Sequence, residues 1–173
     1  MSWELLAQET VYEKYGRAVV EAQFRLPSGA IETFSLRADP PNVAVLALDR
    51  HGSVIVTRQF RPGPGRNLIE LPGGYVNPGE TPQAAAEREL REETGYVGSV
   101  EIVGRCFSDS YSSAVKYCAV SRDSTAVGEQ CLDDTEFIEV LLLSVKEFRE
   151  LLRGGEVADV DLAYLGLDAL HLL

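Results

Sequence analysis

The chain has 173 residues, 45% of them hydrophobic and 25% charged, which is typical of a folded globular protein and excludes disorder as its dominant state. A net charge of −11 argues against a nucleic-acid backbone as the main partner. The longest aliphatic runs, Val43 to Leu48 and Val140 to Leu143, are far shorter than the roughly 20 residues of a membrane-spanning helix. The N-terminal MSWELLAQE has no basic segment or cleavage site, so we expect a cytoplasmic protein without a secretory signal and without a membrane partner.

Cysteine and histidine are too sparse for several kinds of site. Cys106, Cys118 and Cys131 are odd in number, far apart and without CxxC spacing, which favours ordinary thiols in a reducing compartment. With only His51 and His171 present, zinc sites and Ser-His-Asp triads have little to build on.

The first half of the chain reads as strands joined by tight turns. Residues 11–37 alternate between apolar and polar side chains around Pro27-Ser28-Gly29, which predicts a hairpin. Val43 to Leu48 and Ser53 to Arg58 are β-branched runs around residues 49–52, which predicts a second hairpin.

A helix is predicted from Pro82 to Thr94. Thr81 is a suitable N-cap, Pro82 suits the first helical position, and Gly95 is a suitable stop.

The remaining elements indicate an α+β fold. Strands are expected over residues 97–107, 115–121 and 136–143. Ser144 and Glu147 form a capping box that starts a helix through about Leu152, and Val157 to Leu170 reads as a final amphipathic helix. Because strands and helices do not alternate strictly, an α+β fold or a layered α/β/α sandwich is expected.

A cluster of carboxylates marks the predicted first helix. Glu89, Glu92 and Glu93 lie at i, i+3 and i+4 and therefore share one face. A solvated acidic face is one interpretation. The other is a site for a hard cation such as Mg²⁺, which takes oxygen ligands, with a backbone carbonyl of the preceding Gly73-Gly74 pair close by.

These residues resemble the Nudix box, GX5EX7REUXEEXGU, in which U is a bulky aliphatic residue. The positions that align with the box are Gly74, Glu80, Arg88, Glu89, Leu90, Glu92, Glu93, Gly95 and Tyr96. Tyr96, aromatic where an aliphatic residue is usual, is the one departure. The resemblance implies a Nudix-type α/β/α sandwich with a mixed sheet over residues 41–173, preceded by an antiparallel strand region over residues 1–40.

The resemblance also implies roles for the box residues. Glu89 and Glu93 are the expected ligands of Mg²⁺, or of Mn²⁺, with Glu92 contributing through metal or water and the Gly73 carbonyl completing the metal site. Structural support is expected from Gly74, Glu80, Arg88 and Gly95, with Arg88 orienting the carboxylates.

A general base is expected on a later loop. In the ADP-ribose pyrophosphatase branch of the family, a glutamate on such a loop serves as base or added ligand, and Glu136 stands in the corresponding place. Asp133 and Asp134 are alternatives, and a simple charge at a strand edge is the other interpretation of Glu136. The expected catalytic residues are thus Glu92, Glu93 and Glu136.

Further segments resemble the same branch, namely residues 58–62, 70–74, 136–140 and 155–159. Between Asp49 and Glu70 there is no acidic residue, and the four charged residues there are all arginines. Arg61 matches a position that the branch uses for phosphate or terminal ribose, and its planar fork suits that task. Arg58, Arg61 and Glu70 are therefore the candidates for substrate binding, with a solubilising arginine as the alternative for Arg61.

Residues 108–114 depart from the branch. A Ser-Pro-Gly turn followed by a glutamate is usual there, whereas this chain lacks the Pro and Gly and has Ala114 where the acid is expected. The substrate therefore stays open among ADP-ribose, GDP-mannose, UDP-glucose and dinucleoside polyphosphates.

Two functions of different class follow. One is a metal-dependent hydrolase that cleaves the diphosphate bond of a nucleoside diphosphate linked to a second moiety; the other is a catalytically silent Nudix-fold nucleotide sensor. The intact box carboxylates favour the hydrolase. In the resembling branch the N-terminal strands pack across a two-fold partner, so a homodimer is expected, although these strands could instead close the sheet of a monomer.

Overall fold

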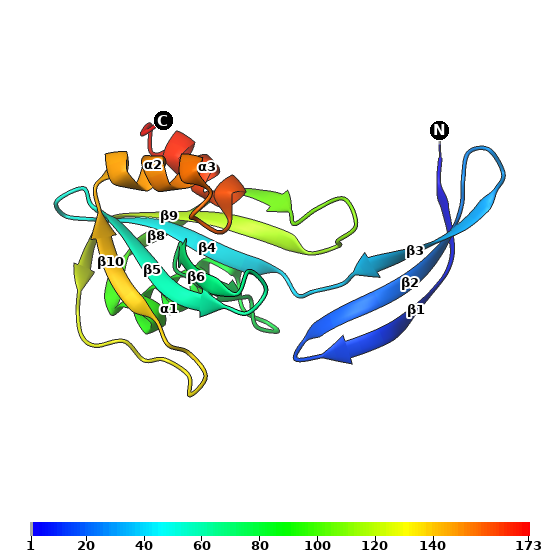
Figure 1. The fold of residues 1–173 in the computed structure, drawn as a ribbon, viewed down its shortest axis with the longest axis horizontal. Helices are drawn as coiled ribbons and strands as arrows, with labels where there is room; N and C mark the ends of the chain where they lie inside the picture. The colour runs from blue at the N-terminus through cyan, green and yellow to red at the C-terminus, as the bar shows by residue number, and fades with distance from the viewer. Residues whose placement is uncertain (1) are drawn as a thin grey trace. The chain divides into compact units, whose positions relative to one another are not determined.

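A computed structural model describes residues 2–173 and divides into two compact units (Figure 1). The first comprises the chain up to Pro41 together with Phe107–Val115, and the second comprises Asn42–Cys106 together with Lys116–Leu173. Within residues 2–173 no helix is both long enough and apolar enough to cross a membrane.

The first unit contains a three-stranded antiparallel sheet in the order β1-β2-β3. Its strands are β1 (Glu4–Lys14), β2 (Arg17–Arg25) and β3 (Ile31–Arg37). The predicted hairpin is confirmed, because β2 and β3 pair around the turn that contains Gly29. Tyr15 and Gly16 both have positive φ, 52° and 73°, as a two-residue hairpin turn between β1 and β2 requires.

The second unit is built on a seven-stranded mixed sheet with the order β10-β5-β4-β9-β8, in which β6 pairs with β5 and β7 with β4. The strands are β4 (Asn42–Asp49), β5 (Val54–Arg61), β6 (Arg66–Glu70), β7 (Gly73–Tyr75), β8 (Tyr96–Phe107), β9 (Val115–Ala126) and β10 (Glu139–Leu143). The second predicted hairpin is confirmed as β4 and β5, while β4 and β9 run parallel.

Helices cover both faces of this sheet, which confirms the predicted α/β/α sandwich (Figure 1). On one face α1 (Pro82–Thr94) packs against Val43, Val45 and Ile55. On the other face α2 (Val145–Gly154) and α3 (Val160–Ala169) pack against a core that includes Leu46 and Val54. Because β4 is buried on both faces, its sequence is continuously apolar rather than alternating.

Helix α1 has the ends that the sequence predicts. The Thr81 hydroxyl accepts a hydrogen bond from the Ala84 N–H at 3.2 Å, and Pro82 occupies the first turn. Gly95 adopts a left-handed conformation with φ of 72° and donates its N–H to the Arg91 carbonyl. The capping box at the start of α2 is confirmed as well.

Four predicted boundaries were wrong. Strand β5 continues to Arg61 instead of ending at residue 58. Strand β10 begins three residues later than expected, because Glu136 lies in a turn closed by its N–H to the Asp133 carbonyl at 2.9 Å. Strand β9 continues to Ala126 instead of ending at residue 121. Helix α3 begins after Asp159 rather than at Val157, because Val157 forms a β-bridge and Asp159 has a left-handed φ of 50°.

The N-cap of α1 gives a test of what holds this helix in place. Replacing Thr81 with Ala removes the side-chain acceptor, and we expect the free energy of unfolding to fall by about 1 kcal/mol in urea titrations. Thr81→Ser keeps a hydroxyl and is expected to stay within a few tenths of a kcal/mol of wild type. Equal stability of Thr81→Ala and wild type would contradict a stabilising cap.

Candidate functional site

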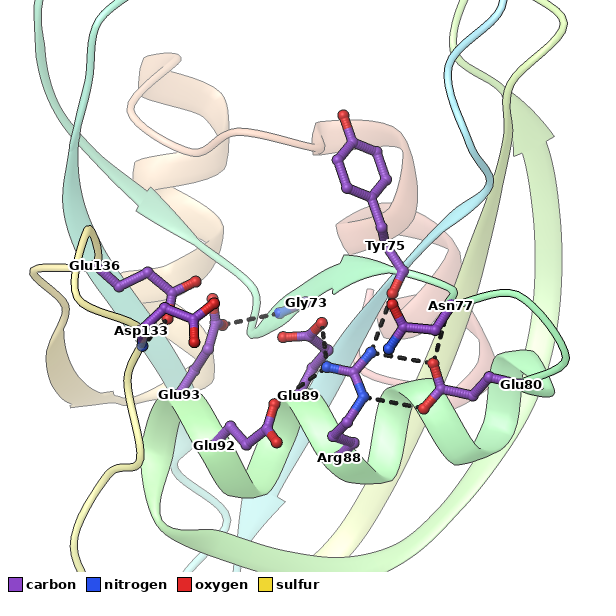
Figure 2. Close-up of polar contacts among 10 residues, drawn as sticks. All are labelled: Gly73, Tyr75, Asn77, Glu80, Arg88, Glu89, Glu92, Glu93, Asp133 and Glu136. Atoms are coloured by element: carbon purple, nitrogen blue, oxygen red, sulfur yellow. Dashed lines mark hydrogen bonds and ion pairs between the residues drawn. The ribbon is translucent and has the colours of Figure 1, made fainter. Parts of the chain in front are cut away.

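Arg88 lies at the centre of the acidic cluster on α1 (Figure 2). Its Nε and Nη2 donate to the two carboxylate oxygens of Glu80 at 2.9 and 3.1 Å. Nη1 donates to Glu89 at 2.7 Å and to Glu92 at 3.1 Å, and Nη2 also donates to the Tyr75 carbonyl at 3.1 Å. One guanidinium therefore joins three carboxylates of the predicted box to the backbone of β7.

Glu80 anchors this arrangement ahead of the helix. One of its oxygens also accepts the Asn77 N–H at 3.0 Å, and the Glu80 N–H donates to the Asn77 carbonyl at 3.0 Å. The hydrogen bonds from Arg88 lower the pKa of Glu80, so the carboxylate is charged at neutral pH.

Glu89 is buried against Gly74. The residue is only 9% exposed, and a Cβ on Gly74 would lie 2.3 Å from its Oε1. Burial raises the pKa of Glu89, and the bond from Arg88 opposes that rise. The absence of a side chain at Gly74 is thus what lets this carboxylate approach β7.

Glu93 is the most deeply buried of the box carboxylates, with 4% exposure. Its Oε2 accepts the Gly73 N–H at 2.9 Å. Burial raises the pKa of Glu93 to about 8, and the negative charges of Glu89 and Glu136 add to the rise. Gly73 is also required to be small, since a Cβ there would lie 2.2 Å from the Val43 carbonyl oxygen.

Glu136 comes to the same place from the loop before β10. Figure 2 shows it beside Glu93, and its charge contributes to the raised pKa of both Glu89 and Glu93. Its Oε2 accepts the Asp133 N–H at 3.0 Å. Asp133 thus holds Glu136 through its backbone, while Asp134 lies in the adjoining exposed turn.

The donor set is made of oxygens. Glu89 Oε2 and Glu93 Oε1 make no hydrogen bond with residues 2–173, and burial raises the pKa values of both carboxylates. Across the same residues, no group of three or more His, Cys, Asp or Glu side chains is placed to hold a metal ion by itself. An open, carboxylate-only arrangement fits Mg²⁺ or Mn²⁺, since Mg²⁺ keeps several waters and completes its shell with substrate phosphates.

Arg61 and Glu70 form an ion pair on neighbouring strands. Arg61 Nε donates to Glu70 Oε1 at 2.6 Å, and Nη2 donates to Glu70 Oε2. Gln59 Nε2 donates to the same carboxylate at 3.2 Å, and Glu70 is only 5% exposed. The hydrogen bonds that Arg61 donates to Glu70 raise the pKa of Arg61, and the charge of Glu93 adds to the effect, so the guanidinium lies within electrostatic reach of the acidic cluster.

Arg58 is not brought to this cluster. It pairs with Glu139 across β5 and β10, where Nε donates at 2.9 Å. Side chains alternate along β5, so Arg58 faces the α2 and α3 side, while Ile55 packs toward α1. Of the three residues predicted to bind substrate, Arg61 and Glu70 lie together and Arg58 lies apart.

Sequence reasoning missed the groups that hold these side chains. Tyr75 and Asn77 act through backbone atoms, which any residue type could supply, so no sequence signal marks them. Gln59 lies between Arg58 and Phe60 in the polar second half of β5, where nothing in the sequence distinguishes it.

Known proteins resemble this chain along most of its length. The NUDIX domain model matches residues 38–162. An ADP-ribose pyrophosphatase of Bacillus subtilis (strain 168) is 29% identical over 162 residues, covering 92% of this chain and 88% of that protein. An ADP-sugar pyrophosphatase of Mus musculus is 54% identical over 50 residues, or 29% of this chain and 23% of that protein. A solved ADP compounds hydrolase superposes with a TM-score of 0.79 at 19% identity, covering 100% of this chain and 98% of that one, which shows a shared fold.

The raised pKa of Glu93 predicts a specific pH dependence of stability. Between its ordinary pKa of 4.5 and about 8, folded Glu93 holds a proton that the unfolded chain releases. Its contribution is therefore present below the ordinary pKa and is lost as pH rises through about 8, by at most about 5 kcal/mol. In EDTA, urea unfolding should show wild type losing stability relative to Glu93→Gln between about pH 5 and about pH 8.

Glu87→Gln supplies the matched control for this experiment, because Glu87 is an exposed glutamate on the same helix. Its stability should follow wild type across the pH range. If wild type and Glu93→Gln change in parallel, Glu93 does not titrate abnormally.

Proposed function

The chain belongs to the Nudix family and is a Nudix pyrophosphohydrolase, and we propose that it cleaves, with a divalent metal ion, the diphosphate bond of a nucleoside diphosphate linked to a second moiety. The observation that carries the proposal is the pair of buried carboxylates, Glu89 and Glu93, packed against the glycines of β7. Burying two neighbouring carboxylates costs free energy of folding unless a cation compensates their charge. A purely structural role does not account for this cost.

Glu89 and Glu93 would hold the metal ion, with Glu92 and the Gly73 carbonyl as further oxygen ligands. When bound, the ion would offset the charge of the diphosphate and lower the pKa of a water. Arg88 contributes by orienting Glu89 and Glu92, and its five donor groups all point at protein acceptors. With the metal ion offsetting negative charge and Arg88 orienting the carboxylates, a chain with a net charge of −11 could bind an anionic substrate.

Glu136 is the proposed general base. Its carboxylate lies near Glu93, and the Asp133 N–H holds one of its oxygens, which leaves the other to take the proton from the attacking water. The water oxygen then bonds to phosphorus, and the bridging oxygen departs with the second phosphate. Asp133 and Asp134 remain the alternative bases.

Arg61 is proposed to bind the diphosphate. Two of its three nitrogens are held by Glu70, and Nη1 makes no hydrogen bond with the described part of the chain. An arginine pre-positioned in this way presents a charged donor to a phosphate oxygen at little entropic cost. Glu70 would then act by orienting Arg61, and Arg58 would stabilise the β5–β10 pairing through Glu139.

The names of the relatives support a substrate class. The names ADP-ribose pyrophosphatase and ADP-sugar pyrophosphatase point to a nucleoside diphosphate joined to ribose or another sugar. We therefore propose ADP-ribose or a sugar nucleotide, with the altered 108–114 segment as the part of the chain that departs from the ADP-ribose pattern.

A substrate screen tests this function. Purified protein is given ADP-ribose, GDP-mannose, UDP-glucose and diadenosine polyphosphates, with Mg²⁺, with Mn²⁺ and with EDTA, and the products are separated by chromatography. We expect cleavage of a diphosphate sugar that stops in EDTA. Silence across the panel, with thermal stabilisation by one of these nucleotides, would instead support a catalytically silent sensor.

Two isosteric substitutions test the site. Glu93→Gln and Glu136→Gln should each lower kcat by about 100-fold or more, since the first removes a metal ligand and the second the base. Glu87→Gln, on the exposed face of α1, should retain wild-type kcat. A fully active Glu93→Gln variant would overturn the metal site, whereas a fully active Glu136→Gln variant would move the base to Asp133 or Asp134.

We also propose a homodimer formed through the first unit. Ala22 is the one buried residue of β1, β2 and β3, although the sheet has an apolar face on which Phe24 and Phe34 contact Trp3. Trp3 is 56% exposed and Leu5 is 49% exposed. A single thin sheet needs a second layer, and another copy of the same face would supply it.

Light scattering should therefore give about twice the chain mass of 19.0 kDa. Trp3→Glu places a charge on the apolar face and should shift the mass toward that of the monomer, whereas Glu9→Gln on the same sheet should leave it unchanged. A wild-type mass near 19.0 kDa would reject the dimer.

A further inference from the structure

The loop between β9 and β10, residues 127–138, is attached to the C-terminal end of α1 by hydrogen bonds. The Val127 N–H donates to the Gly95 carbonyl at 2.9 Å, and the Cys131 N–H donates to the Glu92 carbonyl at 2.8 Å. Between these two lies Gln130, whose side chain makes a third attachment. The loop that carries Glu136 is thus attached to the helix that carries the box carboxylates.

Gln130 joins the two halves of the site directly. Its Nε2 donates one hydrogen bond to the Glu93 carbonyl at 2.5 Å and another to the Ile138 carbonyl at 3.2 Å. Glu93 is a proposed metal ligand, and Ile138 lies two residues beyond Glu136. A single amide group therefore links the backbone at Glu93 to the backbone near Glu136.

The chemistry of the position selects an amide. Helix α1 ends at Thr94, so the carbonyl of Glu93 lies in the last turn, where helical N–H partners are lacking. A primary amide offers two N–H donors on one nitrogen, whereas glutamate offers none and asparagine is one methylene shorter. The glutamine amide reaches both carbonyls and donates one N–H to each without adding a charge.

Packing contributes little to holding this loop. Most of residues 127–138 are exposed, and an open pocket lined by Thr94, Gly128 and Leu132 lies beside the Gln130 side chain. Ile138 is the buried residue of the segment, and Gln130 is bonded to its carbonyl. The distance between Glu136 and the helix therefore depends on hydrogen bonds more than on side-chain packing.

We propose that Gln130 is a positioning residue of the hydrolytic site, whose amide sets the placement of Glu136 relative to Glu93. The inference rests on the proposed function, in which Glu136 removes the proton from the attacking water. In this role Gln130 acts through Glu136, because both N–H groups of its amide are bonded to backbone carbonyls. Small displacements of a catalytic group reduce rates by up to about 100-fold, so a loosened loop should slow the chemical step.

The test is a double-mutant cycle. Gln130→Met keeps the length of the side chain and removes both donors, so kcat should fall by about 10-fold to 100-fold while KM stays within about two-fold of wild type. In the Glu136→Gln background the same substitution should cause little further loss, because its effect passes through Glu136. Glu129→Gln, on the exposed neighbouring residue, should match wild type.

Wild-type kcat in Gln130→Met would overturn the inference. So would an equal loss in both backgrounds, or a loss confined to KM, since each indicates general damage rather than placement of Glu136. If Gln130→Met does not fold, Gln130→Asn carries the same comparison with a shortened amide. Failure of the proposed base is separate, because it shows as full activity of Glu136→Gln whatever Gln130 does.

Discussion

The guanidinium of Arg88 is the interaction on which the site depends. Glutamates spaced three and four residues apart on one helix face repel one another and weaken the helix. Arg88 reverses this by giving its five N–H donors to Glu80, Glu89, Glu92 and the Tyr75 carbonyl. A lysine has three donors and no planar fork, so it could not join the helix, the preceding turn and β7 in the same way.

Glu93 lies outside this compensation, and that gives the site its chemical character. It is almost fully buried and has Glu89 and Glu136 as negative neighbours, which raise its pKa to about 8 although the hydrogen bond from the Gly73 N–H opposes the rise. A divalent cation would relieve this local excess of negative charge. Arg88 therefore compensates most of the carboxylate cluster, whereas the charge of Glu93 is not compensated by Arg88 and is available to a metal ion.

Three separate parts of the chain form the site around Glu93. Strand β7 contributes two glycines, and a side chain at either position would collide with Val43 or Glu89. Helix α1 brings the carboxylates, and the loop before β10 brings Glu136 while Gln130 attaches that loop to the helix. Both β7 and the loop are hydrogen-bonded to Glu93: Gly73 donates to its side chain, and Gln130 donates to its backbone carbonyl.

The local elements could be read from the sequence because their signals are local. Thr81, Pro82 and Gly95 act within one turn of α1, the turn residues act within each hairpin, and the spacing of Glu89, Glu92 and Glu93 determines that they share a face. What depends on long-range contacts could not be read: that Glu136 lies in a turn rather than a strand, that Arg61 pairs with Glu70 while Arg58 turns to Glu139, and that Gln130 reaches Glu93. The sequence by itself thus determined the family, the helix and its carboxylates. Only the tertiary structure decided how buried those carboxylates are and which distant groups meet them, because burial and charge compensation arise from residues far apart in the chain.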